Sequence, residues 1–570
     1  MSLLAIQNLR LSIGDTPILH RIDLDLEAGK VLGIIGESGS GKSMTALSIM
    51  RLLPAGSAAS GAIHLNGTEL LGQTEKQMCA IRGREIGMVF QEPMTALDPL
   101  KTIGAQVAET IWVHDQMSRR EAMAEADRVL DRAGLPRSLF PRDRYPHELS
   151  GGQRQRVVIA SAIALKPKLL IADEPTTALD VTTQARILDL LRRLVDEDGT
   201  GLIFITHDLA VVAGLADDVA VMRHGEVVEA GPTRDVFRAL AHPYTRQLFD
   251  ASSHVPRRDP SRSGWPGEPS GDRSDTAQER PGGEPVLVVD SLIRDYRLPP
   301  RHFLAPAGKF RAVDGVSLRI ERGENVGLVG ESGSGKSTLA RAIMALEPAQ
   351  GGSIAIDGTP LSDRDLVSRR KLQVVFQDPY GSFDPRQRVE TLITEPFHLL
   401  GADAPHGAER RARVDAALTA VGLSPADAGK YIHEFSGGQR QRIAIARALI
   451  IEPSLIVLDE AVSALDVSIR AQILDLLAEL SDRLALSYLF ISHDLSVVRS
   501  ITDRVLVMQN GKIVETGPTA EIFANPQHPY TQELIAATPN LERALQSGLL
   551  SRTAGEGDHA KHGGGGGPTL

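Results

Sequence analysis

The chain has 570 residues, of which 42% are hydrophobic and 24% are charged, a composition typical of roughly two to four globular domains. Its 62 lysine and arginine residues and 72 aspartate and glutamate residues give a net charge of −10, which argues against nucleic acid as the main partner. The single cysteine, Cys79, excludes internal disulfides and metal sites built on several thiolates, and we expect a half-buried thiol there.

No apolar run in the sequence approaches the ~18 to 20 residues that a membrane-spanning helix needs. The first residues, MSLLAIQNLRLSIGD, lack the basic and apolar regions of a signal peptide. We therefore expect the protein to stay in the cytoplasm.

The first predicted strand that carries a motif is VLGIIG, residues 31–36, which runs into GESGSGKS at 36–43 and then into a helix-like segment. Strand, G-x-x-x-x-G-K-S and helix in this order predict a phosphate-binding loop. Backbone N–H groups around Gly39 and Gly41 can surround phosphate oxygens. Lys42 would reach the β and γ phosphates, and Ser43 would offer its hydroxyl to Mg²⁺.

Further along the chain, aliphatic strands in MVFQEP, KLLIADEPTTALD and GLIFITHD end in polar residues. The carboxyl ends of parallel strands share one edge of a sheet, where ligands bind. We expect Asp173 to hold Mg²⁺ and Glu174 to act as the base for the attacking water. His207 would contact the γ-phosphate and the glutamate, and Gln91 would sense Mg²⁺ and the water. The alternatives are an acid pair that caps a helix and a structural histidine.

A different motif, LSGGQRQR, occupies residues 149–156 and precedes apolar residues at helical spacing. We expect Ser150 to Gln153 to cap a helix whose N-terminus is polar and rich in glycine. Such an N-terminus can bind an anion through hydroxyl and N–H donors, without a lysine.

The second half of the chain repeats these motifs. GESGSGKS recurs at 330–337, which places Lys336 294 positions after Lys42 (336 − 42). Six further landmarks are each 286 positions apart: Gln91 and Gln377, Ser150 and Ser436, Asp173 and Asp459, Glu174 and Glu460, Asp180 and Asp466, and His207 and His493. A constant offset of this kind indicates a duplicated domain. We predict the same roles for the second set, with Glu460 as base, His493 beside it, and Ser337, Gln377 and Asp459 at Mg²⁺.

The chain divides into four parts by composition. A domain is predicted at 1–251 and a second at 285–540. Residues 252–284 are rich in proline, glycine, serine and charge, and residues 541–570 end in a glycine- and histidine-rich stretch. We predict a disordered linker for the first of these segments and a flexible tail for the second.

This set of motifs resembles the ATPases of ABC transporters, here with two nucleotide-binding domains on one chain. The resemblance implies an α/β fold with two P-loop NTPase (RecA-like) domains, each with an antiparallel β subdomain and a helical subdomain inserted between the glutamine and the LSGGQ-type signature. Both intervals from glutamine to signature are 59 residues (150 − 91 and 436 − 377), which is room enough for that insertion. ATP-contacting residues implied by the family are Gly36, Ser38, Gly39, Gly41, Lys42, Ser43, Gly330, Ser332, Gly333, Gly335, Lys336, Ser337, Ser150, Gly151, Gly152, Gln153, Ser436, Gly437, Gly438 and Gln439.

The resemblance also implies two ATP molecules bound head to tail, one between Lys42 and Ser436 and the other between Lys336 and Ser150. Members of the family stack adenine on an aromatic residue. Tyr296 occupies that position in the second half, whereas Ile13 takes its place in the first, so we expect weaker adenine binding there. The alternative is that Tyr296 is only a packing residue.

The sequences AHPYTRQLF (241–249) and QHPYTQELI (527–535) are similar to the C-terminal extension of the oligopeptide and dipeptide importer branch. The simpler reading is that Pro-Tyr opens a helix whose tyrosine packs on the core. The branch implies two integral-membrane permease subunits, an extracytoplasmic solute-binding protein, a peripheral position on the cytoplasmic side of the membrane, and no nucleic acid. Peptides are the expected cargo, with nickel chelates, glutathione and short sugars as alternatives. A soluble twin ATPase that acts on ribosomes and an exporter motor are the rival functions.

Overall fold

The computed structural model describes residues 2–115, 117–177, 179–256, 285–298, 308–361, 366–378 and 381–546. Two compact units are formed within these ranges. The first holds the residues up to Leu179, Thr183–Ser253 and the residues from Pro539 onward, and the second holds Asp180–Thr182 and the residues from His254 to Thr538. The predicted linker and tail lie largely outside the described residues.

The described residues of the first unit form one sheet with the strand order β5-β4-β1-β2-β10-β9-β3-β8-β7-β6. Its strands are β1 (Ser2–Ile13), β2 (Thr16–Glu27), β3 (Val31–Ile35), β4 (Ser57–Leu65), β5 (Thr68–Glu69), β6 (Ile86–Val89), β7 (Leu169–Asp173), β8 (Gly201–Ile205), β9 (Asp218–Arg223) and β10 (Glu226–Pro232). Strands β6, β7, β8, β3 and β9 pair in parallel, and β1, β2, β4 and β5 pair antiparallel. The parallel strands β3, β7 and β8 are buried at every position, because helices cover both faces of such a sheet.

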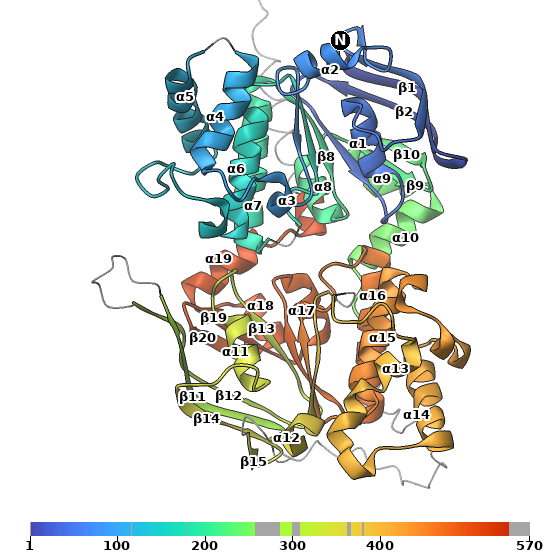
Figure 1. Ribbon diagram of the computed structural model, residues 1–570, viewed down its shortest axis with the longest axis vertical. Coiled ribbons are helices and arrows are strands. Elements are labelled where there is room, and N and C mark those ends of the chain that lie inside the picture. Colours follow the sequence, from blue (N-terminus) through green and yellow to red (C-terminus); the bar gives the residue numbers. More distant parts are fainter. Residues whose placement is uncertain are drawn as a thin grey trace, which may run out of the picture. The chain divides into compact units, whose positions relative to one another are not determined.

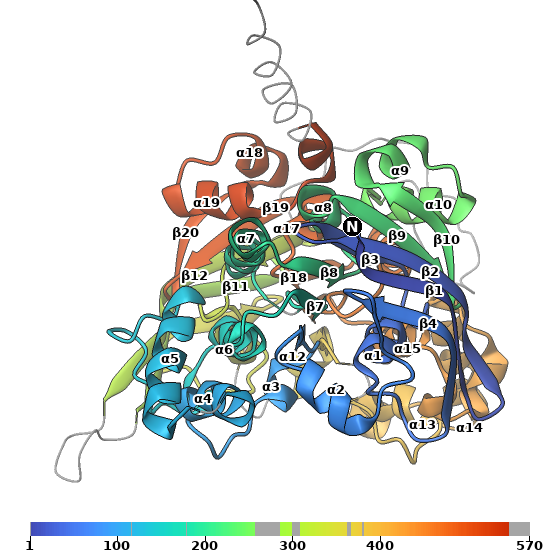
Figure 2. The same cartoon turned by 90° about the horizontal axis from the view of Figure 1, so that it is seen from above.

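The helices of the first unit include three that pack on one another, α4, α5 and α6 (Figures 1 and 2). The helices are α1 (Lys42–Met50), α2 (Glu75–Ile81), α3 (Pro93–Ala96), α4 (Ile103–His114), α5 (Arg119–Arg132), η1 (Pro146–Glu148), α6 (Gly151–Ile163), α7 (Val181–Asp198), α8 (Leu209–Leu215), α9 (Thr233–Ala239) and α10 (Pro243–Ser252). Elements α3, α4, α5 and η1 all lie between Gln91 and Ser150, where the family resemblance predicted a helical insertion. That prediction is confirmed.

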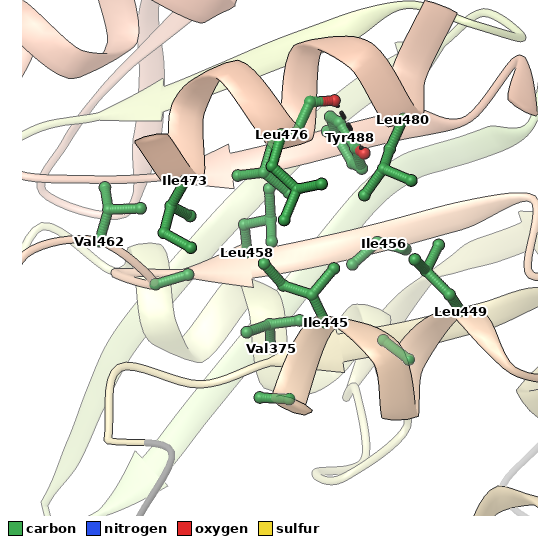
Figure 3. Packing of buried hydrophobic residues seen from close by; sticks show 14 of the residues in the cluster. Val375, Ile445, Leu449, Ile456, Leu458, Val462, Ile473, Leu476, Leu480 and Tyr488 are labelled. Carbon is green, nitrogen blue, oxygen red and sulfur yellow. Dashed lines mark hydrogen bonds between the residues drawn. The ribbon is translucent and has the colours of Figure 1, made fainter. Parts of the chain in front are cut away.

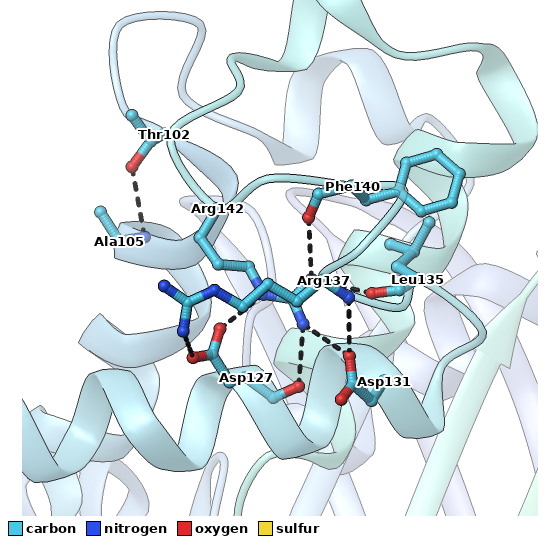
Figure 4. A network of polar contacts seen from close by, with 8 residues as sticks. All are labelled: Thr102, Ala105, Asp127, Asp131, Leu135, Arg137, Phe140 and Arg142. Carbon is cyan, nitrogen blue, oxygen red and sulfur yellow. Dashed lines mark hydrogen bonds and ion pairs between the residues drawn. The ribbon is translucent and has the colours of Figure 1, made fainter.

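A buried arginine fixes the loop after α5 to that helix in the first unit (Figure 4). The Arg142 side chain is 8% exposed and donates to carboxylate oxygens of Asp127 at 2.6 Å and Asp131 at 2.7 Å, both on α5. It also donates to the carbonyl oxygen of Leu135 at 2.8 Å. An unpaired buried guanidinium costs free energy. The hydrogen bonds of Arg142 therefore fix the loop after α5 against the helix.

In the second unit, the strands form two sheets, with the orders β12-β11-β14-β15 and β16-β17-β18-β13-β19-β20 among the described residues. They are β11 (Leu287–Arg297), β12 (Lys309–Ile320), β13 (Asn325–Val329), β14 (Gly351–Ile356), β15 (Thr359–Pro360), β16 (Leu372–Val375), β17 (Leu455–Asp459), β18 (Ser487–Ile491), β19 (Arg504–Gln509) and β20 (Lys512–Pro518). The order β16-β17-β18-β13-β19-β20 repeats the order β6-β7-β8-β3-β9-β10 of the first unit. The two units therefore share one topology.

The helices of the second unit follow the same plan. They are α11 (Lys336–Ile343), α12 (Leu366–Lys371), α13 (Val389–Ile393), η2 (Glu395–Asp403), α14 (Gly407–Ala420), η3 (Pro425–Gly429), η4 (Ile432–Glu434), α15 (Gly437–Leu449), α16 (Val467–Leu484), α17 (Leu495–Ile501), α18 (Thr519–Ala524) and α19 (Pro529–Ala537). Elements α13 to η4 again fill the interval from the glutamine to the signature.

The main core cluster of the second unit forms where α15 and α16 pack on one face of the parallel sheet (Figure 3), while α11 packs on the other face. Ile445 of α15 and Ile473 of α16 meet Leu458 of β17, and each side chain is fully buried. Tyr488 of β18 is also fully buried, and its hydroxyl donates to the carbonyl oxygen of Leu477 at 3.1 Å. Helices on both faces of a parallel sheet give the α/β architecture that the sequence predicted.

Two further sequence-based expectations concern the surface. Among the described residues, no helix is long and apolar enough to cross a membrane. The expectation of a half-buried thiol at Cys79 is wrong, because this residue is exposed on α2. Met78 takes the buried face of that short helix, and the Cys79 sulfur lies 3.7 Å from a carboxylate oxygen of Glu75.

Candidate active site

Each predicted phosphate loop connects a buried strand to a helix: β3 leads into α1, and β13 leads into α11. Gly41 and Gly335 precede these helices with φ angles of 102° and 110°, a conformation that residues other than glycine rarely adopt. The Lys42 ammonium is 6% exposed and donates to the carbonyl oxygens of Gly36 at 2.7 Å and Glu37 at 2.9 Å. In the second unit, Lys336 donates to Gly330 and Glu331 at the same distances.

The loop of the first unit fits a polyphosphate and a hard divalent cation. A side chain built on Gly39 would meet nothing within 4 Å, so the centre of the loop is open. Ser38 and Gly39 are exposed there, and the buried hydroxyl of Ser40 has no hydrogen-bond partner among the residues that the structure describes. The Ser43 hydroxyl donates to a carboxylate oxygen of Asp173 at 3.2 Å. These are the oxygen ligands that Mg²⁺ prefers, beside N–H groups suited to phosphate.

The centre of the loop is open in the second unit too. Gly333 and Ser332 are exposed, and a side chain built on Gly333 would also meet nothing within 4 Å. Burial lowers the pKa of the Lys336 ammonium, although the carboxylates of Glu460 and Asp459 favour its charged form. The lysine therefore lies in a site of low polarity that an anionic ligand would complete.

The two carboxyl groups at the end of β7, those of Asp173 and Glu174, have pKa values shifted in opposite directions. Burial raises the pKa of Asp173, and this effect outweighs the hydrogen bond from Ser43, which lowers the pKa. Burial acts in the same direction on Glu174, but hydrogen bonds and charge from His207, with a hydrogen bond from Thr177, leave the pKa of Glu174 below its ordinary value. The pair Asp459 and Glu460 shows the same split. Opposed shifts in neighbouring carboxyl groups favour different roles for the two, with the glutamate ready to act as a base.

Both candidate bases have an unusual backbone conformation. The φ angles of Glu174 and Glu460 are 46° and 52°, in the left-handed region that costs free energy for a residue with a side chain. Each conformation is fixed by the backbone, because the N–H of Glu174 donates to Ile205 and that of Glu460 to Ile491, both at 2.9 Å. Strain of this kind often marks a functional position.

Three side chains surround the Glu174 carboxylate. The Gln91 amide donates to it at 3.1 Å, the Thr177 hydroxyl donates to it at 2.9 Å, and His207 Nδ1 lies 3.6 Å away. The structure therefore brings together Gln91, Glu174 and His207, as the sequence predicted. The Thr177 contact was not predicted, and only its place three residues after the glutamate could have suggested it.

The surroundings of Glu460 differ in part. His493 Nδ1 lies 3.4 Å from its carboxylate, as His207 does near Glu174. The Gln377 amide, however, donates to the hydroxyl of Ser463 at 3.4 Å, and Ser463 in turn donates to the backbone carbonyl of Glu460 at 2.8 Å. Gln377 thus reaches the glutamate indirectly in this conformation.

The signature sequences begin the helices α6 and α15, which confirms the predicted helix cap. Ser150 is the N-cap of α6: its hydroxyl accepts from the N–H of Gln153 at 3.3 Å, and its own N–H donates to the Gln153 side chain at 3.0 Å. Ser436 and Gln439 form the same capping box on α15. Ser150 and Gly151 are exposed, and so are Ser436 and Gly437, as a ligand-binding N-terminus requires. Gly152 and Gly438 are buried against the following helix.

Comparison with known families matches residues 19–177 and 313–463 to the ABC transporter model. The chain belongs to the ABC transporter family. Residues 228–282 and 514–566 match the oligopeptide/dipeptide transporter C-terminal region. Family membership makes both units ATP-binding domains, and their P-loop, glutamate and signature sequences occupy the places described above.

Curated relatives match this ABC ATPase along nearly its whole length. It is 47% identical over 541 residues to the glutathione import ATP-binding protein GsiA of Salmonella choleraesuis (strain SC-B67), covering 91% of this chain and 86% of that protein. It is 46% identical over 573 residues to the protein of the same name from Escherichia coli (strain K12), covering 96% of this chain and 91% of that protein. The similarity therefore includes both halves.

Two solved structures that are similar to this ABC ATPase each cover less than half of it. The dimeric post-hydrolysis state of the ATP-binding cassette MJ0796, bound to ADP and Pi, is 29% identical with a TM-score of 0.37, and covers 41% of this chain and 98% of that one. CbiO1 from Clostridium perfringens is 27% identical with a TM-score of 0.38, and covers 48% of this chain and 99% of that one.

The candidate adenine platform is built differently in the two halves. The Tyr296 hydroxyl donates to the Glu347 carboxylate at 2.6 Å, and the Arg294 guanidinium lies 4.8 Å from the centre of the tyrosine ring. Arg294 also pairs with Glu347 at 3.0 Å. The guanidinium therefore contacts the face of the ring, and the carboxylate binds its hydroxyl. In the first half, Ile13 takes the place of Tyr296, Leu53 that of Glu347 and Leu11 that of Arg294. That half therefore has apolar residues at the three positions that hold the ring in the second half.

Replacing Ile13 by Tyr is expected to raise the affinity of the first site for ATP about fivefold, the low end of the gain from base stacking on an aromatic ring. The gain is low because Leu11 and Leu53 offer the new hydroxyl and ring no polar partners. ATP titration in a Lys336→Ala background would isolate the first site. An unchanged affinity would remove this account of the asymmetry, and Tyr296→Ile in a Lys42→Ala background is the matched change in the second site.

Proposed function

We propose that this chain is the ATP-hydrolysing subunit of an importer and that it powers the uptake of short peptides, with glutathione as the leading cargo. The observation that carries this proposal is its 46–47% identity to glutathione import ATP-binding proteins over 91–96% of its length. The match of both halves to the oligopeptide/dipeptide transporter C-terminal region supports the peptide class.

The names of the relatives change the order of the candidate cargoes. The sequence alone placed peptides first and left glutathione among the alternatives, with nickel chelates and short sugars. Because glutathione is itself a tripeptide, it satisfies both the branch and the relatives' name. A role on ribosomes gains no support from these matches.

In the proposed mechanism, each phosphate loop binds ATP through its N–H groups and its lysine, Lys42 or Lys336. Ser43 and Asp173 would hold Mg²⁺ in the first half, and Ser337 and Asp459 in the second, with Gln91 and Gln377 nearby. Bound Mg²⁺ would neutralise charge on the phosphates. Glu174 and Glu460 would polarise the attacking water, and their low pKa keeps them ionised at neutral pH.

The histidines have a positioning part in this proposal. His207 and His493 lie within 3.6 Å and 3.4 Å of their glutamates, close enough to orient the carboxylate toward a γ-phosphate. The reciprocal use of the signatures, with each Ser-Gly-Gly-Gln sequence completing the site of the other half, stays a prediction from the sequence.

The proposed partners are two integral-membrane permease subunits and, through them, an extracytoplasmic solute-binding protein, with the chain attached at the cytoplasmic face. A groove of about 420 Å³ in the first unit supports a permease contact. It lies between β6, α4 and α6, and its lining includes Phe90, Leu97, Thr110 and Val158. Phe90 is 40% exposed, so it offers apolar surface to a docked segment of a partner.

The test is to express the chain with two candidate permeases, purify the complex, and measure ATP-dependent uptake into vesicles in the presence of a solute-binding protein. We expect accumulation of glutathione that competing short peptides reduce and nickel chelates leave unchanged. Copurification with ribosomes in place of membrane proteins would contradict the proposal.

A variant that fills the groove is expected to separate transport from hydrolysis. Thr110→Trp should reduce recovery of the permeases by about tenfold while the isolated chain keeps its ATPase rate, because α4 lies outside the phosphate site. Ala124→Trp, at an exposed position of α5, is the control and should recover the permeases normally.

A further inference from the structure

The His-Pro-Tyr sequences begin α10 and α19 in the same way in both units. Glu229 accepts from the N–H groups of Ala241 and His242, each at 3.1 Å, and so fixes the residues just before α10. The His242 Nδ1 atom accepts from the N–H of Tyr244 at 3.2 Å and caps the helix, while Pro243 takes the first helical position. The motif therefore sets the direction of the tyrosine that follows it.

The second unit repeats each of these contacts 286 positions later. Glu515 accepts from the N–H of Gln527 at 2.8 Å and from that of His528 at 3.1 Å. His528 Nδ1 accepts from the N–H of Tyr530 at 3.2 Å. The same hydrogen bonds therefore begin this helix in both units.

Both tyrosine hydroxyls reach the phosphate loop of their own unit. The Tyr244 hydroxyl accepts from the N–H of Glu37 at 3.0 Å, and the Tyr530 hydroxyl accepts from the N–H of Glu331 at 2.8 Å. The side chains are 2% and 5% exposed. Burial raises the pKa of Tyr530 to about 12, so the hydroxyl stays protonated throughout the neutral range. The sequence predicted a tyrosine that packs on the core, and the contact with the loop adds to that packing.

The contact acts on the peptide group that holds the lysine. The N–H of Glu37 and the carbonyl of Gly36 belong to one planar trans peptide unit and point to opposite sides of it. Tyr244 binds the N–H side, and the Lys42 ammonium binds the carbonyl side at 2.7 Å. A rotation of this peptide would break both bonds, so the tyrosine fixes the plane against which the lysine rests.

We propose that Tyr244 and Tyr530 are positioning residues for ATP binding, through which the C-terminal extension of each half sets the conformation of its phosphate loop. The inference rests on the proposed function for its link to ATP hydrolysis. The tyrosines contact the loop backbone and act on ATP through it. Loss of the hydroxyl leaves a loop N–H without its acceptor and frees the peptide to turn.

The experiment compares Tyr244→Phe in a Lys336→Ala background and Tyr530→Phe in a Lys42→Ala background with the parent chains. Phenylalanine keeps the ring and removes only the hydrogen-bond acceptor. We expect ATP to bind about tenfold more weakly in each case, as does inorganic triphosphate, which has no base. In the full chain with both lysines, the double variant should show a KM for ATP raised about tenfold with kcat within about twofold of wild type.

The control is Tyr488→Phe, which removes an equally buried hydroxyl whose partner, Leu477, lies in α16 (Figure 3). It should lower the unfolding temperature and leave ATP affinity unchanged. Hydrogen exchange gives an independent measurement: the loop amides at Glu37 and Glu331 should exchange faster in the Tyr244→Phe and Tyr530→Phe chains and at the wild-type rate in Tyr488→Phe.

Unchanged ATP affinity together with unchanged exchange at the loop would overturn the inference. A fall in affinity for ATP with none for inorganic triphosphate would overturn it as well, because the effect would then act on the base. A wild-type chain that does not hydrolyse ATP would instead refute the proposed function, so the two failures are distinguishable.

Discussion

Glu174→Gln and Glu460→Gln are each expected to lower the rate of ATP hydrolysis by at least roughly tenfold, because a positioned general base contributes about 10²- to 10⁴-fold to a rate. Glutamine has the size of glutamate and lacks its charge. The left-handed backbone at both positions is therefore kept, and the change is confined to the group that would polarise water. The measurement is ATP turnover at saturating ATP in the purified complex.

The contacts of Glu174 explain why the charge is needed. Gln91 and Thr177 donate to one of its carboxylate oxygens, and His207 lies beside the other. Although burial opposes it, His207 and Thr177 lower the pKa of Glu174, so the carboxylate is ionised at neutral pH. A glutamine in its place would present an amide NH₂ that can only donate there.

Glu85→Gln is a matched control for this prediction. Glu85 pairs with Lys168 on the surface of the first unit at 3.0 Å, and exposed pairs of this kind contribute little. Its turnover should stay within about twofold of wild type. Wild-type turnover in either the Glu174 or the Glu460 variant would contradict the assignment of two competent sites.

Sequence spacing was enough to place the reacting groups because each ends a strand. In parallel sheets the carboxyl ends of the strands lie at one edge, so Gln91, Glu174 and His207 had to meet once their strands were recognised. The signature cap was predictable for a similar reason: a serine three residues before a glutamine is a local pattern with one common outcome.

Contacts between distant segments could not be predicted in this way. Tyr244 meets the N–H of Glu37 across 207 positions of sequence (244 − 37), and no local pattern encodes which backbone group a buried hydroxyl finds. The positive φ of Glu174 was equally hidden, because it results from a hydrogen bond to the neighbouring strand at Ile205. The exposure of Cys79 depended on which face of a short helix Met78 would take.

The duplication also conceals differences that only side-chain geometry reveals. Gln91 donates directly to Glu174, whereas Gln377 donates to Ser463. Residues 177 and 463 correspond across the repeat, and the change from threonine to serine accompanies this change of partner. Two sites with the same motifs can therefore differ in how the glutamine is engaged.

Gly36→Ala and Gly330→Ala are expected to weaken ATP binding about hundredfold, because the added methyl group has no room and the backbone favours glycine. A Cβ on Gly36 would lie 2.2 Å from the backbone carbonyl oxygen of Met222, and one on Gly330 would lie 2.2 Å from that of Met508. Their φ angles, 152° and 154°, are also unfavourable for alanine. A strand backbone cannot withdraw as a flexible side chain would, so the loop itself must move.

A movement of the loop would displace the carbonyl oxygen that binds the lysine. The carbonyl of Gly36 accepts from Lys42, and its peptide also carries the N–H that Tyr244 holds. Calorimetric ATP titration and thermal unfolding of the same samples would separate loss of affinity from loss of fold, and we expect the affinity to fall in chains that remain folded.

Gly67→Ala and Gly358→Ala supply the comparison. These residues lie in the turns after β4 and β14 with φ angles of 78° and 72°, and a Cβ on either meets nothing within 4 Å. They carry the backbone strain without the collision, so they should lower stability modestly and leave ATP affinity unchanged. If Gly36→Ala behaved like Gly67→Ala, the close approach of the loop to the strand at Met222 would have no part in nucleotide binding.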